Sequence, residues 1–178
     1  MGIEHTSVPR WPADAPPFDP RARSATVLAL CADAEPVAAA WAAAGGAAGV
    51  PVSSCTGDLE QALRHLDADM AGAVVGWRLL VAGPEAEVLR VRARATELGA
   101  VGSEVLAHVT GVPSRRVLCV HCDAVTETDE PVGGTVACAG CGHDLHLYHH
   151  VSRRLGAYLG FLTDAEERDP AGAVLETR

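Results

Sequence analysis

The chain has 178 residues, a hydrophobic fraction of 48% and a formal net charge of −9, and all 14 of its basic residues are arginines. This length suits one ordinary domain with a small second one, and the apolar content is sufficient for a packed core. An acidic chain without a basic segment is disfavoured as a general binder of nucleic acid phosphates. No apolar run is long enough to cross a bilayer without a charge, so no membrane contact is expected.

Residues 1–23 carry five prolines and predict an extended arm without helix or central strand. Trp11 and Phe18 are the only aromatic residues of this arm. They could dock on a partner or on the chain's own fold, or the arm could be a loosely ordered tail. The arm lacks the apolar core of a signal peptide, so we expect a cytoplasmic protein whose thiols stay reduced.

Residues 24–110 alternate strand-like and helix-like segments, a pattern typical of an α/β domain with a parallel sheet. Strands are expected over residues 24–31, 49–53, 73–82 and 103–110. Helices are expected over residues 34–44, with Gly45 and Gly46 as the stop, over residues 58–68, and from Pro84 to Gly99. Within this domain Cys31 and Cys55 are interpreted as small buried hydrophobic residues, and His65 as a surface histidine.

Two cysteine pairs follow a short hinge over residues 111–116. Each pair has the form CxxC, and fifteen residues separate them; the four cysteines are Cys119, Cys122, Cys138 and Cys141. This spacing predicts one tetrahedral four-thiolate metal site, with two short strands and a turn between the pairs, as in a zinc ribbon. Two unrelated pairs of reduced cysteines, or disulfides, are the alternatives. Zinc is the expected metal and iron is the alternative.

Five histidines crowd the same region: His121, His143, His146, His149 and His150. None is expected as a ligand, because four thiolates complete the tetrahedron, although some could hydrogen-bond to the ligands. The glycine after the second pair, Gly142, permits the left-handed backbone that a tight turn often needs. A strand is expected at Leu145 and Leu147.

The ribbon is assigned to residues 115–162 and ends in a short helix. The helix is predicted because apolar residues recur at i, i+3, i+4 and i+7, namely Leu155, Tyr158, Leu159 and Leu162. Residues 163–178 are interpreted as an acidic tail.

Residues 79–100 (LLVAGPEAEVLRVRARATELGA) are similar to the nicotinamide-binding domain of ferredoxin–NADP reductase relatives. In that family a Cys-Gly-Pro turn precedes the helix, and here Ala82 replaces the cysteine. The glycine-rich turn after the first strand is also replaced, because residues 30–35 read LCADAE. Two acids there would repel a pyrophosphate. The resemblance therefore implies a degenerate Rossmann-like scaffold, and a working NADPH-binding domain is the alternative.

Residues 138–160 (CAGCGHDLHLYHHVSRRLGAYLG) resemble the small zinc-ribbon A subunit of bacterial dimethylamine monooxygenase, in the haem-dependent oxidative N-demethylases. The string from His150 to Gly160 is more specific than the cysteines. The resemblance covers roughly residues 24–162. It implies a complex in which one partner subunit carries haem and another, a reductase with FMN and a [2Fe–2S] cluster, takes electrons from NADPH.

The implied reaction converts dimethylamine and oxygen to methylamine and formaldehyde. In such a complex this chain would be a non-catalytic subunit for assembly or coupling, with no catalytic site of its own. Ser152, Arg153 and Arg154 are candidates for contact with a partner subunit, because arginine forks bind carboxylates. A rubredoxin-like iron carrier of electrons and a nucleic-acid-binding ribbon are the alternatives.

Overall fold

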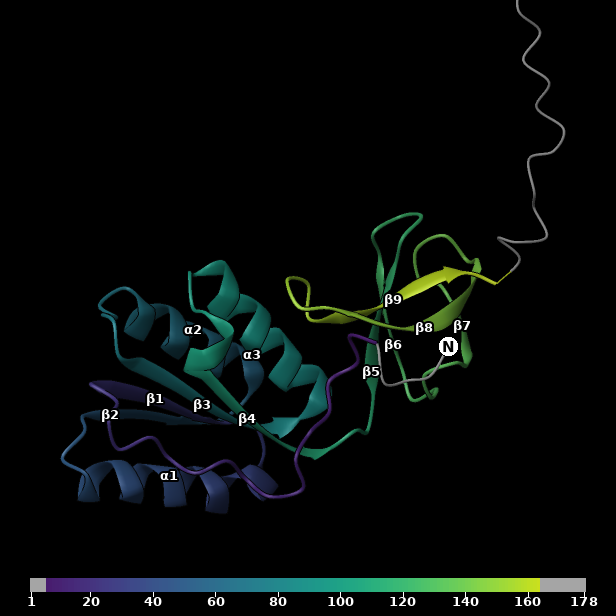
Figure 1. The fold of residues 1–178 in the computed structure, drawn as a ribbon. Helices are drawn as coiled ribbons and strands as arrows, with labels where there is room; N and C mark the ends of the chain where they lie inside the picture. Colours follow the sequence, from purple (N-terminus) through teal and green to yellow (C-terminus); the bar gives the residue numbers. More distant parts are fainter. Residues whose placement is uncertain (1–5, 164–178) are drawn as a thin grey trace, which may run out of the picture.

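The computed structural model describes residues 6–163, which form two β-sheets that lie side by side (Figure 1). The first sheet is parallel, with the strand order β2-β1-β3-β4. Its strands are β1 (Ser24–Ala29), β2 (Val52–Thr56), β3 (Trp77–Pro84) and β4 (Val105–Gly111). The mixed α/β class with a parallel sheet is therefore confirmed.

Three helices cover the first sheet. Figure 1 shows α1 (Glu35–Ala47) on one face and α2 (Leu59–Met70) and α3 (Glu85–Glu97) on the other. Short 3-10 turns, η2 (Ala32–Ala34) and η3 (Gly102–Glu104), precede α1 and β4. Strands β1 and β3 are buried along nearly their whole length, because both of their faces meet helices.

The first helix ends later than predicted. Gly45 and Gly46 lie inside α1, and the chain leaves the helix at Gly49, where φ is 70°. Packing requires Gly45, because a Cβ there would lie 2.4 Å from the Val52 side chain and 3.1 Å from the Phe18 ring. The glycine pair therefore marks a close approach of the arm and β2 to the helix, rather than a turn.

The described part of the arm, residues 6–23, packs on the chain's own fold. Trp41 on α1 donates its indole N–H to the Pro16 carbonyl at 2.8 Å, and Phe18 packs on the core beneath the same helix. Farther toward the N-terminus, Trp11 packs between the first sheet's core and the second sheet's core. Figure 1 shows the arm running from the second sheet past α3 and along α1.

The second sheet is the ribbon, with the strand order β6-β5-β9-β8-β7. Its strands are β5 (Arg115–Cys119), β6 (Val125–Thr128), β7 (Thr135–Ala137), β8 (Asp144–Ser152) and β9 (Ala157–Leu162). The two strands predicted between the cysteine pairs are present as β6 and β7, but they pair with β5 and β8 instead of with each other.

The predicted C-terminal helix is wrong, because residues 157–162 form strand β9 between β5 and β8. The leucine spacing fits a helix, yet Gly160 lies in the middle of the sheet. A Cβ on Gly160 would come within 2.7 Å of the Val117 side chain and 3.1 Å of the Leu145 side chain. Pairing with two neighbouring strands overrides the local spacing here. Of the predicted acidic tail, residues 164–178 lie outside the described residues.

One buried carboxylate joins the arm, α3 and the ribbon. Glu85, the first residue of α3, is only 3% exposed. Its Oε1 accepts the Trp11 indole N–H at 2.7 Å, and both carboxylate oxygens lie 3.1 Å from the Tyr158 hydroxyl on β9. Burial and the neighbouring Glu85 charge raise the pKa of Tyr158 to about 12, so the phenol keeps its proton and donates a hydrogen bond to the carboxylate.

The turn between β8 and β9 lies directly on the backbone of α3. Gly156 has a φ of 59°, and a Cβ there would lie 2.6 Å from the Leu89 carbonyl oxygen. Arg116 fixes the same turn, because its guanidinium donates to the Gly156 carbonyl at 3.1 Å. The string from residue 150 to residue 160, which carries the resemblance, therefore takes part with β5 in the contact between the ribbon and the α/β domain.

We expect Gly156→Ala to destabilise the protein by about 1–3 kcal/mol, since the new methyl group meets main-chain atoms at a left-handed position. Gly46→Ala is the matched control, because Gly46 lies in α1 with open space around it. The control should raise stability by about 0.5–1 kcal/mol. Chemical denaturation measures both changes, and an unchanged unfolding free energy for Gly156→Ala would contradict this account of the junction.

We also expect the stability to fall as the pH rises from about 10 to about 12, because the pKa of Tyr158 is higher in the folded state than in the unfolded chain. Tyr158→Phe should remove this alkaline loss and lower stability near pH 8 by about 1–3 kcal/mol through the lost hydrogen bonds. The chain has no lysine, and the measurement uses the metal-loaded protein, in which the four ribbon cysteines are thiolates without a proton to lose. Tyr148→Phe, at a residue that is 50% exposed, should keep the wild-type pH profile of the unfolding free energy.

Candidate metal centre

The four predicted cysteines converge at one end of the ribbon. The first pair begins at Cys119, the last residue of β5, and the second pair lies in the turn between β7 and β8. All four sulfur atoms lie within 4.8 Å of one another. The Cys119 and Cys141 sulfurs are 3.8 Å apart, and those of Cys122 and Cys138 are 3.6 Å apart.

These distances fit a metal site and do not fit disulfides. A tetrahedron with metal–sulfur bonds of about 2.3 Å has edges of about 3.8 Å. A disulfide would bring two sulfurs to about 2.05 Å, whereas all four cysteines are free thiols. The donor set is therefore the right size for one four-coordinate ion such as Zn²⁺ or iron, with no position left for a fifth ligand.

The two cysteine turns share one backbone pattern. The Asp123 N–H donates to the Cys119 carbonyl, and the Gly142 N–H donates to the Cys138 carbonyl, both at 2.9 Å. The residue after each pair is left-handed, with φ of 59° at Asp123 and 74° at Gly142. The sequence predicts this conformation for Gly142. It gives little sign of it at Asp123, because aspartate adopts positive φ only occasionally.

The electrostatics of the thiols favour a bound cation. Backbone N–H groups of Cys141 and Gly140 lower the pKa of Cys138 to about 6. A backbone hydrogen bond from Ala124 also favours the Cys122 thiolate, but loss of solvent and the neighbouring sulfurs outweigh it and raise the pKa of Cys122 to about 12. The Cys138 thiol thus ionises readily, and its negative charge opposes ionisation of the neighbouring thiols. A divalent cation removes this opposition, because all four thiolates then face a positive charge.

Residues outside the cysteines hold the two turns together, and the sequence did not single them out. The buried Thr126 hydroxyl on β6 accepts the Ala139 N–H of the second turn at 3.0 Å. Gly140 lies against the first turn, where a Cβ would be 2.6 Å from the Ala124 methyl group and 3.1 Å from the Cys122 sulfur. A threonine in an exposed-looking strand and one glycine among 18 give no distinctive sequence signal.

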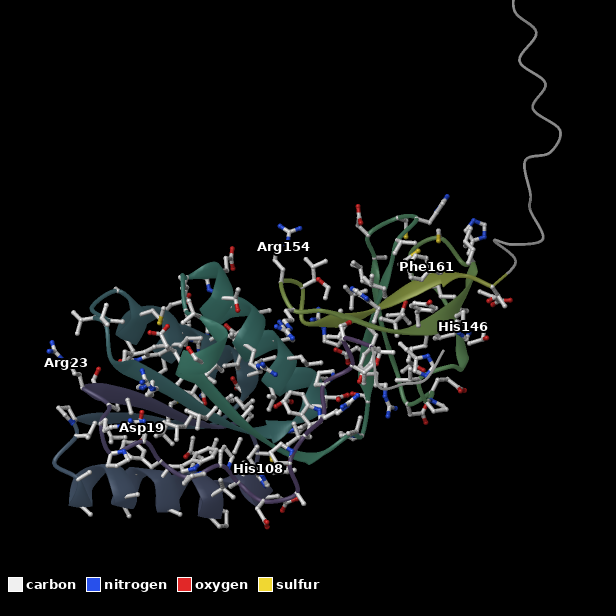
Figure 2. The ribbon with its side chains drawn as sticks, in the orientation of Figure 1. Asp19, Arg23, His108, His146, Arg154 and Phe161 are labelled. Atoms are coloured by element: carbon white, nitrogen blue, oxygen red, sulfur yellow. The ribbon has the colours of Figure 1, made fainter. Side chains whose placement is uncertain are left out.

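Two of the five histidines lie at the metal centre. The His121 and His143 rings meet edge to face, with centroids 5.1 Å apart, and their ring nitrogens lie within 4.8 Å of the Cys141 sulfur. His146 and His149 instead neighbour the Tyr148 ring on β8, at 6.3 Å and 6.5 Å between centroids. Figure 2 shows His146 and Phe161 on the ribbon, away from the first sheet.

The three residues predicted to contact a partner lie at the opposite end of β8 from the second cysteine turn. Nine residues of strand span roughly 25 Å. The Ser152 hydroxyl accepts the Leu155 N–H at 3.3 Å and stabilises the turn into β9. Arg153 and Arg154 are both exposed, and Figure 2 shows Arg154 pointing away from this turn.

The α/β domain contains a Ser-His-Asp cluster, but its hydrogen-bond geometry is not that of a catalytic triad. The Ser53 hydroxyl lies 2.7 Å from Nε2 of His65, and Asp69 lies 3.6 Å from that same nitrogen. In a triad the carboxylate orients the ring through the other nitrogen. Asp69 instead accepts the Thr26 hydroxyl at 2.6 Å. His65, interpreted from sequence as a surface histidine, is thus part of a hydrogen-bond network between α2 and the sheet.

The other two cysteines lie in the α/β domain, away from the ribbon. The Cys31 sulfur lies 3.7 Å from the Thr110 hydroxyl, and Cys55 packs at the edge of the core. Both are half-buried free thiols. Among residues 6–163, no helix is both long and apolar enough to span a membrane.

Residues 116–161, from β5 to β9, match the family described as dimethylamine monooxygenase subunit DmmA-like, C-terminal domain. The chain is also 36% identical over 104 residues to the heme-dependent oxidative N-demethylase delta subunit of Ectopseudomonas mendocina (strain ymp). That match covers 57% of this chain and 57% of the relative. No solved structure matches the chain. The two matches confirm the family resemblance predicted from residues 138–160.

We expect the purified chain to hold one equivalent of metal and Cys138→Ser to lose most of it, with a lower thermal midpoint. Cys55→Ser, which changes a free thiol outside the ribbon, should keep the full equivalent. Elemental analysis and thermal unfolding measure both effects. A Cys138→Ser protein with a full equivalent of metal would contradict the four-thiolate site.

Proposed function

We propose that this chain, whose C-terminal domain is DmmA-like, is a non-catalytic subunit of an oxidative N-demethylase complex. In the proposed reaction, dimethylamine, oxygen and NADPH with one proton yield methylamine, formaldehyde, water and NADP⁺. Haem would lie in one partner subunit, and FMN and a [2Fe–2S] cluster in a reductase partner. The 36% identity to a demethylase delta subunit carries this proposal.

The metal in this proposal is zinc with a structural role. A closed set of four thiolates offers no open position for a substrate, as is typical of structural zinc sites. The ribbon core is small, so a metal that clamps both cysteine turns would supply much of its folding free energy. Cys119 and Cys138 are buried in that core, next to Val117 and Leu145.

The proposed role of the chain is to assemble the haem and reductase subunits into one complex or to couple them for electron transfer. Of the three predicted contact residues, Ser152 accepts a hydrogen bond within its own turn, and Arg153 lines a cavity together with residues of α3. Arg154 is exposed and does not line this cavity, so we assign it the contact with a carboxylate of a partner subunit.

The first sheet is, in this proposal, a degenerate Rossmann-like scaffold related to the ferredoxin–NADP reductases and working in the cytoplasm. The order β2-β1-β3-β4 is compatible with a doubly wound sheet. At the end of β3, Gly83 lies against Leu30, where a Cβ would come within 2.6 Å. Asp33 in the 3-10 turn after β1 and Glu35 at the start of α1 occupy the region where such folds bind a pyrophosphate. Their charges argue against nucleotide binding.

A rubredoxin-like iron centre that carries electrons is the second candidate. Two observations favour it. The Gly140 N–H lies 3.4 Å from the Cys138 sulfur, and such hydrogen bonds tune the potential of iron–sulfur sites. Cys141 is also only half-buried, which leaves the metal close to the surface. A colourless metal-loaded protein would rule this candidate out, and a red one would support it.

Reconstitution of the complex tests the proposed function. We expect the haem and reductase subunits to demethylate dimethylamine slowly or not at all without this chain, and the metal-loaded chain to restore formaldehyde formation. The isolated chain should form none. Arg154→Ala should weaken co-purification with a partner subunit, whereas Arg21→Ala, at an exposed arginine on the arm, should not. Full activity without this chain would contradict the proposal.

A further inference from the structure

A cavity of about 670 Å³ lies where the arm, α3 and the ribbon meet. Residues 6–11 of the arm form one wall. The second half of α3 with the segment leading to β4 forms another, and the end of β8 with its turn forms the third. Figure 1 shows the arm passing between α3 and the ribbon at this place. A volume of this size lies within the range of small-molecule sites.

The cavity is positively charged in a protein that is acidic as a whole. Its described lining includes Arg10, Arg92 and Arg153 and no acidic side chain. Within residues 6–163, no ion pair or hydrogen bond joins the guanidinium of Arg92 or Arg153 to a carboxylate. Arg94, two residues farther along the same helix, is paired with Asp67 at 2.7 Å.

Arg92 is held in a fixed place without being neutralised. Its guanidinium lies over the Trp11 ring, 5.3 Å from the centroid, and the Trp11 indole is itself anchored on Glu85. Arg92 and Arg153 line the same cavity, and burial together with the like charge of Arg153 lowers the pKa of Arg92. An anion between the two guanidinium groups would relieve both the repulsion and the lost hydration.

We propose that this cavity binds a small dianion with phosphoryl or carboxylate groups, held between the guanidinium groups of Arg92 and Arg153. Both group types match the planar fork of arginine. The Thr96 hydroxyl, which also lines the cavity, is already committed to the Arg92 carbonyl at 2.9 Å. The two guanidinium charges therefore recognise the dianion, and the aromatic ring of Trp11 positions Arg92.

Calorimetric titration of the metal-loaded full chain with inorganic phosphate and, separately, with succinate tests the proposal and distinguishes the two group types. We expect one of these anions to saturate a single site below about 10 mM and to raise the thermal midpoint. The double variant Arg92→Gln/Arg153→Gln should bind at least about tenfold more weakly. The metal content should be the same before and after titration, because the anion is not expected to bind at the cysteine site.

The matched control removes the same number of charges outside the cavity. In Arg64→Gln/Arg94→Gln both changed residues pair with carboxylates, Glu60 and Asp67, so this variant should bind the anion as the wild type does but unfold more easily. Without anion, the cavity variant should be at least as stable as the control. An equal loss of binding in both variants, or no saturable binding by the wild type, would overturn the proposal. Binding of polyglutamate alone would also overturn it, in favour of an acidic segment of a partner.

Discussion

Four sulfur atoms at the end of the ribbon are the constraint on which the rest of the molecule depends. They come from two turns that are fifteen residues apart in the sequence, and they approach to the edge length of a metal-centred tetrahedron. Thiols at this distance oppose one another's ionisation, as the raised pKa of Cys122 shows. A cation converts this opposition into attraction. Strands β5 and β8, which enter and leave the two turns, are thereby fixed, and β9 can pair between them.

Strand β9 and the turn before it connect the cysteine end of the ribbon to the α/β domain. Tyr158 donates to Glu85 at the start of α3, and Gly156 allows the turn to touch the α3 backbone. Trp11 completes the same contact from the arm. The residues that carry the family resemblance most specifically are therefore junction residues. Gly156 and Tyr158 in this string are placed by how the two sheets meet.

Sequence reasoning succeeded where a local rule decides the outcome. The spacing of the cysteines predicted that the four thiols lie together, and the alternation of apolar segments indicated the parallel sheet. It failed where distant contacts decide. The leucine spacing from Leu155 to Leu162 fits a helix, but residues 157–162 pair with β5 and β8 as a strand. Gly45 was predicted to end a helix, but a glycine is needed there because Phe18 and Val52 pack closely against it. The pairing of Trp11 with Arg92 joins residues that no local pattern connects.

The functional account follows from four thiols spaced for one metal ion and from a packed junction between the two sheets, in a chain similar to one subunit of a demethylase. X-ray absorption at the metal edge of the purified full chain tests the central claim most directly. We predict four sulfur neighbours at about 2.3 Å and no nitrogen or oxygen in the first coordination sphere. A fit that required a histidine nitrogen from His121 or His143, or a bound water, would contradict a closed structural centre.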